Sequence, residues 1–344
     1  KAVHPRAELA IGQPDIAIDE SGPVRKKRDG AVQNSMSGIH ALFLSILFTM
    51  VRRGWAKIKN PCGGCPAAGG LLPSRKINRE EPMDYTEIKF DVRDDGIATM
   101  TLNRADKLNS FTRKMFEEWK DVVARCVFED NIRVLVITGE GRAFSSGVDL
   151  AALGSDTLKQ PAFRFYYRQA HQAFDDMETA ELPIIAAVNG LCYGGGVELA
   201  LSCDIVLSSD MATYCLVENQ LGAIPASGAC NRMIHHVGLS KTKELIITAD
   251  PIHAEEARRI GLVAQVYKHE QFMDRVYAYA ERLLKNSPFA MGMAKHVVNM
   301  CVNADMHTGR DIERLAQSAL CLSEDHKEGM AAFFEKRDPV FKGE

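Results

Sequence analysis

The stretch Ala187-Val188-Asn189-Gly190-Leu191-Cys192-Tyr193-Gly194-Gly195-Gly196-Val197-Glu198-Leu199-Ala200 decides the fold expected for this chain. A short apolar run, 184–188, predicts a buried strand that ends where the glycines approach, and a helix is expected to begin at them. Consecutive glycines let the backbone come close to a ligand and offer unpaired N–H groups where a helix begins. The carboxylate of Glu198, on the first turn of that helix, is therefore expected beside whatever those N–H groups bind.

A second carboxylate follows twenty residues later in Tyr214-Cys215-Leu216-Val217-Glu218. If Glu218 lies near the same point, the two glutamates form an acid/base pair. Such a pair suits chemistry on a carbon next to a carbonyl, because backbone N–H groups can stabilise an enolate oxygen. From the residues alone, the alternative is a helix-capping role for Glu198 and a solvent-exposed Glu218.

A comparable loop, 142–150, follows another apolar run at 134–138. Loops that follow parallel buried strands emerge at one sheet edge, where α/β proteins bind ligands. We therefore expect N–H groups from the two loops to converge on one oxygen, although tight structural turns are the alternative. Neither the dinucleotide fingerprint nor the phosphate loop occurs in the sequence.

The bulk composition is that of a globular protein: 344 residues, 46% hydrophobic and 25% charged, with a formal net charge of -3. This charge gives no basic footprint for nucleic acid. The nine cysteines have irregular spacing, and most lie inside apolar segments, which indicates small buried hydrophobes in a reducing compartment rather than a disulfide framework. The pair in Cys62-Gly63-Gly64-Cys65 has no partner set, so we expect no metal or redox site there.

Residues 1–82 differ in amino-acid composition from the rest of the chain and are interpreted as a disordered or leader segment. The apolar run 41–51 is too short to span a bilayer. No Asp or Glu occurs from Met36 to Arg79, whereas basic residues are frequent there, as in an organelle transit segment. We therefore expect a mitochondrial location, with a cytoplasmic or peroxisomal one as the alternative. A short membrane anchor and an upstream extension ahead of Met36 also stay open for this segment.

The remaining chain reads as an α/β core, 83–270, followed by a C-terminal helical region, 271–344. Phe333 and Phe334 in that region are expected to pack inward. The elements predicted for the core are a hairpin of Ile88–Val92 and Ile97–Leu102, a helix over 112–128 capped by Thr112, strands at 134–138, 184–188 and 204–208, and helices from Ala254 onward with one strand near 262–266.

The glycine-rich stretch quoted above resembles the signature of the enoyl-CoA hydratase/isomerase (crotonase) family. Three other motifs carry the same resemblance: Asn103-Arg104-Ala105-Asp106-Lys107-Leu108-Asn109, Phe144-Ser145-Ser146-Gly147-Val148-Asp149 and Ala254-Glu255-Glu256-Ala257-Arg258-Arg259-Ile260-Gly261-Leu262-Val263. The resemblance as a whole covers roughly residues 85–344. The resemblance implies a crotonase-like spiral core of ββα units and a C-terminal helical region involved in oligomerisation, as a homotrimer or homohexamer.

The resemblance also implies a site for an acyl-CoA thioester. The N–H groups of Val148 and Gly195 would hold the thioester oxygen, Glu218 would deliver a proton to the α-carbon, and Glu198 would orient and deprotonate water. No metal or cofactor is expected, since coenzyme A is part of the substrate. The residues expected to bind the substrate are Val148, Asp149, Leu150, Ala151, Gly194, Gly195 and Arg142, the last as a phosphate neighbour unless it is a solvated surface charge.

The implied activity is that of an enoyl-CoA hydratase in fatty-acid or amino-acid breakdown. An enoyl-CoA delta isomerase of the same superfamily, using Glu218 alone, is the alternative; a non-catalytic RNA- or partner-binding role is less favoured, and neither nucleic acid nor stable membrane insertion is expected. Three motifs depart from the family: Leu216-Val217-Glu218 replaces Gln-Pro-Glu, Ile224-Pro225-Ala226 replaces Ile-Pro-Gly, and Asn231-Arg232 replaces a usual Gln-Arg. The added methyl of Ala226 leaves water placement open.

Overall fold

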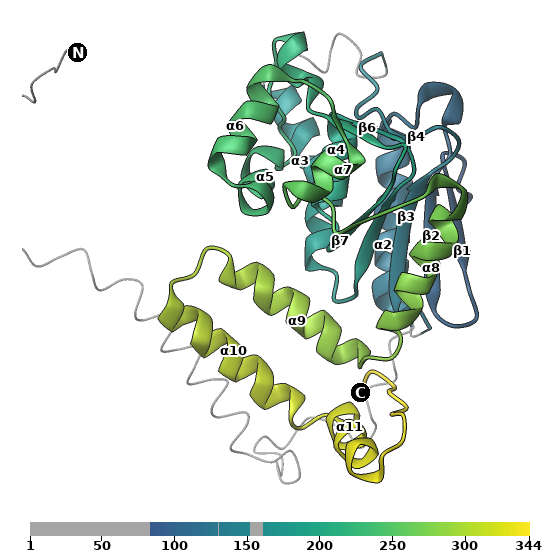
Figure 1. Ribbon diagram of the computed structural model, residues 1–344, viewed down its shortest axis with the longest axis vertical. Helices are drawn as coiled ribbons and strands as arrows, with labels where there is room; N and C mark the ends of the chain where they lie inside the picture. Colours follow the sequence, from purple (N-terminus) through teal and green to yellow (C-terminus); the bar gives the residue numbers. More distant parts are fainter. Residues whose placement is uncertain (1–82, 130, 152–160) are drawn as a thin grey trace, which may run out of the picture. The chain divides into compact units, whose positions relative to one another are not determined.

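A hairpin of two antiparallel strands, β1 (Ile88–Val92) and β2 (Ile97–Leu102), opens the fold as the sequence predicts (Figure 1). The turn between them contains Gly96 at φ +91°, a left-handed conformation that glycine adopts without steric cost. A side chain at this position would also collide with the backbone oxygen of Asn131. The hairpin is thus fixed by its turn and by its buried second strand.

The computed structural model describes residues 83–129, 131–151 and 161–344. They belong to one compact unit, Arg79–Glu344. The predicted leader and its Cys62-Gly63-Gly64-Cys65 motif lie outside the described residues. Residues 152–160, which follow the loop 142–150, also lie outside them.

The hairpin continues into a six-stranded sheet. Apart from β1, all its strands run parallel, and they read as apolar runs because both faces of the sheet are covered. All six residues of the strand Val134–Gly139 and all five of the strand Ile184–Val188 are buried. In spatial order the sheet consists of β1, β2, β3 (Val134–Gly139), β5 (Ile184–Val188), β7 (Ile205–Ser209) and β10 (Gln265–Tyr267).

Short strands form a second, smaller sheet, and three of them follow a strand of the large sheet in the chain. Its strands are β4 (Ala143–Ser145), β6 (Leu191–Tyr193), β8 (Thr213–Cys215) and β9 (Ile252–His253), in that spatial order. Three times, a strand of the large sheet is followed by a short strand of the small sheet and then by a helix. This repeated ββα unit is the spiral that the resemblance implied, and the α/β class is confirmed.

Seven α-helices accompany the two sheets in the described part of the core. They are α2 (Arg113–Phe128), α3 (Ala162–Thr179), α4 (Gly195–Leu201), α5 (Ala229–Val237), α6 (Leu239–Thr248), α7 (Ala254–Arg259) and α8 (Phe272–Leu283). The predicted cap of α2 is confirmed, because the Thr112 hydroxyl accepts a hydrogen bond from the N–H of Met115 at 3.1 Å.

Two hydrophobic clusters hold the large sheet from its two faces. Leu135 and Ile137 of β3 belong to the cluster that contains Trp119 of α2. The alternate residue Val136 belongs to a smaller cluster with Val276 of α8. Because strand side chains alternate between faces, one apolar strand serves both clusters.

One strand begins later than predicted. The sequence suggested 262–266, whereas β10 starts at Gln265. Gly261 turns the chain at φ +92°, and the N–H groups of Leu262 and Val263 both donate to the carbonyl of Ala257. These two apolar residues close the end of α7, so their burial reflects a helix terminus and not a strand.

Three further helices complete the chain: α9 (Pro288–Cys301), α10 (Met306–Leu320) and α11 (Glu324–Glu335), with α9 and α10 side by side and antiparallel (Figure 1). Lys295 of α9 is buried and pairs with Asp204 at 3.0 Å. Its ammonium also donates to the carbonyl of Met177 at 2.7 Å. This buried cation ties α9 to the core.

Many apolar side chains of these helices stay exposed. Phe333 and Phe334 are 76% and 73% exposed, so the prediction that they pack inward is wrong for the single chain. No helix within the described ranges is long and apolar enough to cross a membrane.

Candidate active site

Two glycine loops meet at the ends of neighbouring parallel strands. Gly147 follows β4 and Gly195 follows β6, and these strands pair directly. A Cβ built on Gly147 would lie 2.6 Å from the backbone nitrogen of Gly195, and one on Gly195 would lie 3.2 Å from the Cα of Gly147. Gly147 also has φ +89°. Only glycines allow the two loops to approach this closely.

Two N–H groups at this meeting point, those of Val148 and Gly195, have no partner in the part of the chain that the structure describes. Phe111 pairs on both sides of Val148: its N–H donates to the carbonyl of Gly147 at 2.8 Å, and its carbonyl accepts from Asp149 at 2.9 Å. Gly194 donates to Cys215 at 2.8 Å. Within residues 83–129, 131–151 and 161–344, the N–H groups of Val148 and Gly195 have no hydrogen-bond acceptor.

Glu198 lies on the first turn of α4 and is only 3% exposed. Its Oε1 accepts a hydrogen bond from the N–H of Ser227 at 2.6 Å. Burial raises the pKa of Glu198, while the Ser227 N–H, the Ser227 hydroxyl, the Ala229 N–H and the charge of Arg232 all oppose that rise. The carboxylate is thus buried and at the same time held by donors that favour its ionised form.

Glu218 lies on the 3₁₀-helix η3 (Val217–Leu221) and is half-buried. A Cβ built on Gly194 would lie 3.2 Å from its Oε1, which places this carboxylate against the glycine loop. Its Oε2 is buried and has no hydrogen-bond partner among the described residues. Burial, followed by the negative charge of Glu198, raises the pKa of Glu218 to about 7, against the effect of its own N–H.

The structure therefore brings these residues together from three elements: α4, which carries both Gly195 and Glu198, η3, which carries Glu218, and the loop of Val148 after β4. Glu198 accepts a hydrogen bond from Ser227, whereas the pKa of Glu218 is raised to about 7. A pair of carboxyl groups whose surroundings differ in this way can act as base and acid in one reaction. This arrangement is chemically an acid/base pair beside two backbone donors.

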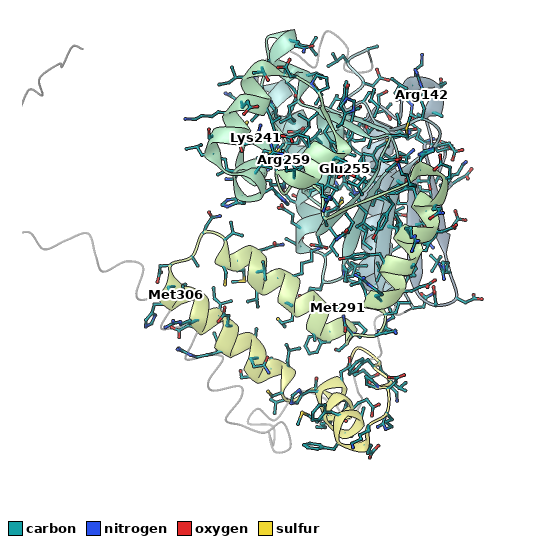
Figure 2. The ribbon with its side chains drawn as sticks, in the orientation of Figure 1. Arg142, Lys241, Glu255, Arg259, Met291 and Met306 are labelled. Atoms are coloured by element: carbon teal, nitrogen blue, oxygen red, sulfur yellow. The ribbon has the colours of Figure 1, made fainter. Side chains whose placement is uncertain are left out.

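The other residues predicted to bind a substrate lie farther from this pair or have partners. Asp149 pairs with Arg104 at 3.1 Å, which fixes the loop after Gly147. Leu150 is 61% exposed, and Ala151 next to it is exposed as well. Arg142 is exposed at the amino end of β4, whereas Gly147 follows the carboxyl end, so the strand separates them (Figure 2). Their substrate contacts remain predictions.

Sequence reasoning missed the residues that hold Glu198. Ser227 is 29 residues away in the chain, and its N–H reaches the carboxylate only because η3 and the loop before α5 return to α4. Arg232 donates from Nη1 to the carbonyl of Ser227 at 2.5 Å. No spacing in the sequence signals these contacts.

Among the described residues, no group of three His, Cys, Asp or Glu side chains lies in an arrangement that could hold a metal ion. His235 and His236, adjacent on α5, are both exposed. The ionisable groups gathered beside the glycine loops are the two glutamates and the thiol of Cys230. Burial raises the pKa of that thiol, and the charges of both carboxylates raise it further.

The family model described as enoyl-CoA hydratase/isomerase matches residues 92–344. Crotonyl-CoA hydratase from Syntrophomonas wolfei is 34% identical over 260 residues, which cover 75% of this chain and 99% of that protein. The mitochondrial methylglutaconyl-CoA hydratase of Homo sapiens is 32% identical over 294 residues, covering 82% and 85%. The solved enoyl-CoA hydratase of Bacillus anthracis, 32% identical, aligns with a TM-score of 0.72 over 75% of this chain and 100% of that one. The chain belongs to the enoyl-CoA hydratase/isomerase family.

Proposed function

We propose that this protein is an enoyl-CoA hydratase, which adds water across the 2,3 double bond of a trans-2-enoyl-CoA in fatty-acid or amino-acid breakdown. One observation carries the proposal: Glu198 and Glu218 lie against the same glycine loop, beside two N–H groups that lack acceptors among the described residues. The hydratase names of two relatives at 34% and 32% identity support the reaction class.

In the proposed reaction, the N–H groups of Val148 and Gly195 donate to the thioester oxygen. Negative charge develops on that oxygen as water adds to C3, so these donors stabilise the transition state more than the substrate. Removing one such donor from an oxyanion hole costs about 2.7–4 kcal/mol of transition-state stabilisation. The loop contact between Gly147 and Gly195 keeps the two donors together.

The proton transfers balance between the two glutamates. The water oxygen bonds to C3 while Glu198 takes one of its protons, and Glu218 gives a proton to C2. Glu218 suits the acid role because its pKa is raised to about 7. Glu198 suits the base role because Ser227 donates to it and favours its ionised form. General acid/base help of this kind contributes about 10²–10⁴-fold.

The acyl-CoA is proposed to lie along Val148, Leu150 and Ala151, with Arg142 as a neighbour of its phosphates. The pairing of Asp149 with Arg104 supports this strip from behind. The proposed reaction needs neither a metal nor a redox cofactor, because both bonds to hydrogen are made and broken as proton transfers.

An enoyl-CoA isomerase is the second candidate, and one observation favours it. The Oε2 atom of Glu218 has no protein partner among the described residues, so this carboxyl alone could move a proton between C2 and C4. Glu198 would then be dispensable for chemistry.

Incubating the full chain with crotonyl-CoA and following the absorbance of the conjugated thioester tests the proposal. The wild-type protein should consume the conjugated thioester, and Glu198→Gln should lose that activity. If Glu198→Gln hydrates normally, the two-carboxylate mechanism is wrong. If the wild-type protein converts a 3-enoyl-CoA into its conjugated isomer without hydrating crotonyl-CoA, the isomerase is the correct assignment.

We also infer a homotrimer or homohexamer and a mitochondrial location. The C-terminal helices support the first, because a single chain leaves a large apolar area exposed there. Met306 at the start of α10 is 72% exposed, as are Phe333 and Phe334 of α11 to a similar extent (Figure 2). The mitochondrial name of the human relative supports the second. Light scattering on the purified protein and imaging of a full-length fluorescent fusion are the respective tests.

A further inference from the structure

Arg232 of α5 is a largely buried cation with no part in the proposed proton transfers. Its side chain is only 13% exposed. Two acidic residues of α3 hold it: its Nε donates to Glu178, and its Nη2 lies 3.7 Å from Asp175. Burying a guanidinium is costly unless it is paired and hydrogen-bonded, so these partners fix it in one place.

The remaining arm of Arg232 reaches the loop that holds Glu198. Nη1 donates to the carbonyl of Ser227 at 2.5 Å, while the N–H of the same Ser227 donates to Oε1 of Glu198 at 2.6 Å. Gly228 follows at φ +101°, and a Cβ there would lie 2.1 Å from Nη1. The guanidinium thus lies directly against this turn, and a glycine makes room for it.

We propose that Arg232 is a positioning residue for Glu198, acting through Ser227. Anchored on α3, it fixes the Ser227 turn so that the Ser227 N–H and hydroxyl hold the carboxylate of Glu198 in its ionised form and in one orientation. The inference rests on the proposed function for its kinetic consequence only, because the hold on Glu198 is measurable without any substrate.

The charged and titratable groups around this cluster come from α3, α5, η3 and the segment after α4, where burial raises the pKa of Cys203 and the charge of Arg232 opposes that rise. Glu218 of η3 and Cys230 of α5 face the carboxylate of Glu198. His171 of α3 lies beside Asp175 and Arg232, which raise and lower its pKa respectively, although burial lowers it most. Arg232 opposes the burial-driven rise in the pKa of Glu198. Removing this cation should therefore make Glu198 harder to ionise.

The test compares Arg232→Met, which removes both charge and hydrogen bonds, with Arg232→Lys, which keeps the charge and loses the planar fork. Arg259→Met is the matched control, because Arg259 on the surface of α7 is 69% exposed and distant in role (Figure 2). In the full chain labelled with ¹³C at glutamate carboxyls, the Glu198 signal is assigned by its loss in Glu198→Gln. We expect its titration midpoint to rise by about one unit in Arg232→Met.

Kinetics supply the second readout. Hydration of crotonyl-CoA by Arg232→Met should show kcat lowered about 10- to 100-fold with KM little changed, since a misplaced base affects the chemical step. The acidic limb of its pH profile should move upward with the Glu198 titration. In Arg232→Lys, which keeps the positive charge, the titration midpoint of Glu198 should rise less than in Arg232→Met, but the carboxylate of Glu198 should lose its fixed orientation. Arg259→Met should match the wild-type protein.

The outcomes separate the two proposals. An unchanged Glu198 titration in a folded Arg232→Met overturns the positioning role, whatever happens to activity. If Arg232→Met does not fold, Glu178→Gln loosens the same anchor without touching Ser227, and an unchanged Glu198 titration there overturns the role equally. If the titration shifts but the wild-type protein fails to hydrate crotonyl-CoA, the positioning of Glu198 stands and the proposed function fails.

Discussion

The two carboxylates of this site have opposite surroundings. Glu198, on the first turn of α4, is almost fully buried and accepts a hydrogen bond from Ser227. Glu218, on η3, is only half-buried, yet its Oε2 is buried without a partner among the described residues. Burial raises the pKa of both groups, but donors counteract that rise chiefly at Glu198.

Burial alone therefore does not assign acid and base roles to the two carboxyl groups. Hydrogen-bond donors favour the ionised form of a carboxyl group, whereas burial with few donors favours its protonated form. Glu218 also experiences the charge of Glu198, which adds to the effect of burial. The donor-poor carboxyl therefore suits proton donation and the donor-rich one suits proton abstraction.

The largest expected effect is that of Glu218→Gln. If Glu218 is the acid, its amide cannot give a proton to C2, and kcat for crotonyl-CoA hydration should fall about 10²–10⁴-fold. Glu198→Gln should lower it comparably, and the double variant should be little worse than either, because residues acting as a unit are not additive. Glu255→Gln, on the exposed surface of α7, is the control (Figure 2). A Glu218→Gln enzyme within threefold of wild type would contradict the assignment.

Gly147→Ala tests the contact between the glycine loops, beside which both carboxylates lie. Its Cβ would press on the backbone nitrogen of Gly195 and displace one donor of the proposed hole. We expect kcat to fall about 10²–10³-fold. Gly238→Ala is the matched control, because Gly238 also has positive φ but has open space around it. Equal losses in both variants would mean that backbone strain, and not the blocked donor, is responsible.

The pH dependence of kcat/KM distinguishes the two carboxyl groups, because each should limit activity at a different side of the profile. Glu218 must be protonated to act, and its pKa is raised to about 7, so activity should fall about tenfold per pH unit above that value. At the acidic side activity should fall as Glu198 becomes protonated. Profiles of crotonyl-CoA hydration between about pH 5 and 9 measure both limbs. The assignment is wrong if the alkaline limb persists unchanged in Glu218→Gln.

The free energy of unfolding should change least of all, and Glu218→Gln should raise it more than Glu198→Gln does. The pKa of Glu218 is higher in the fold than in the unfolded chain, so the fold loses stability as pH rises from its ordinary range through about 7. Glu218→Gln removes this loss and should raise the free energy of unfolding at pH 8 by about 1 kcal/mol, after discounting for solvent screening. Glu198→Gln should gain less, because it weakens the bond from Ser227. Urea unfolding at pH 5 and 8 measures both; a Glu218→Gln protein no more stable than wild type at pH 8 would refute the difference.

Local patterns predicted most of the large sheet. The apolar run 184–188 became β5 with the same bounds, because a strand covered on both faces needs a continuous apolar run. The short strands of the small sheet were not predicted: β4, β6 and β8 have three residues each. A pattern of three residues is too short to carry a period.

At the site, the two carboxylates were easier to predict from the sequence than the residues that hold them in place. The carboxylates of Glu198 and Glu218 follow glycine-rich or motif-bearing segments, so sequence alone could single them out. The Ser227 N–H donates to Glu198 and the Ser227 carbonyl accepts from the Arg232 side chain, and backbone groups like these are present along the whole chain. Their selection depends on which loop returns to α4.

Local periodicity and residue type were enough to predict the α/β class, the glycine loops and the two candidate carboxyl groups. The contact of Gly147 with Gly195, the donors to Glu198 and the hydrogen bond from Arg232 to Ser227 are visible only in the folded chain. The first two of these relations join residues that are tens of positions apart. Distance in space between such residues is set by the packing of the whole ββα spiral and has no local signature in the chain.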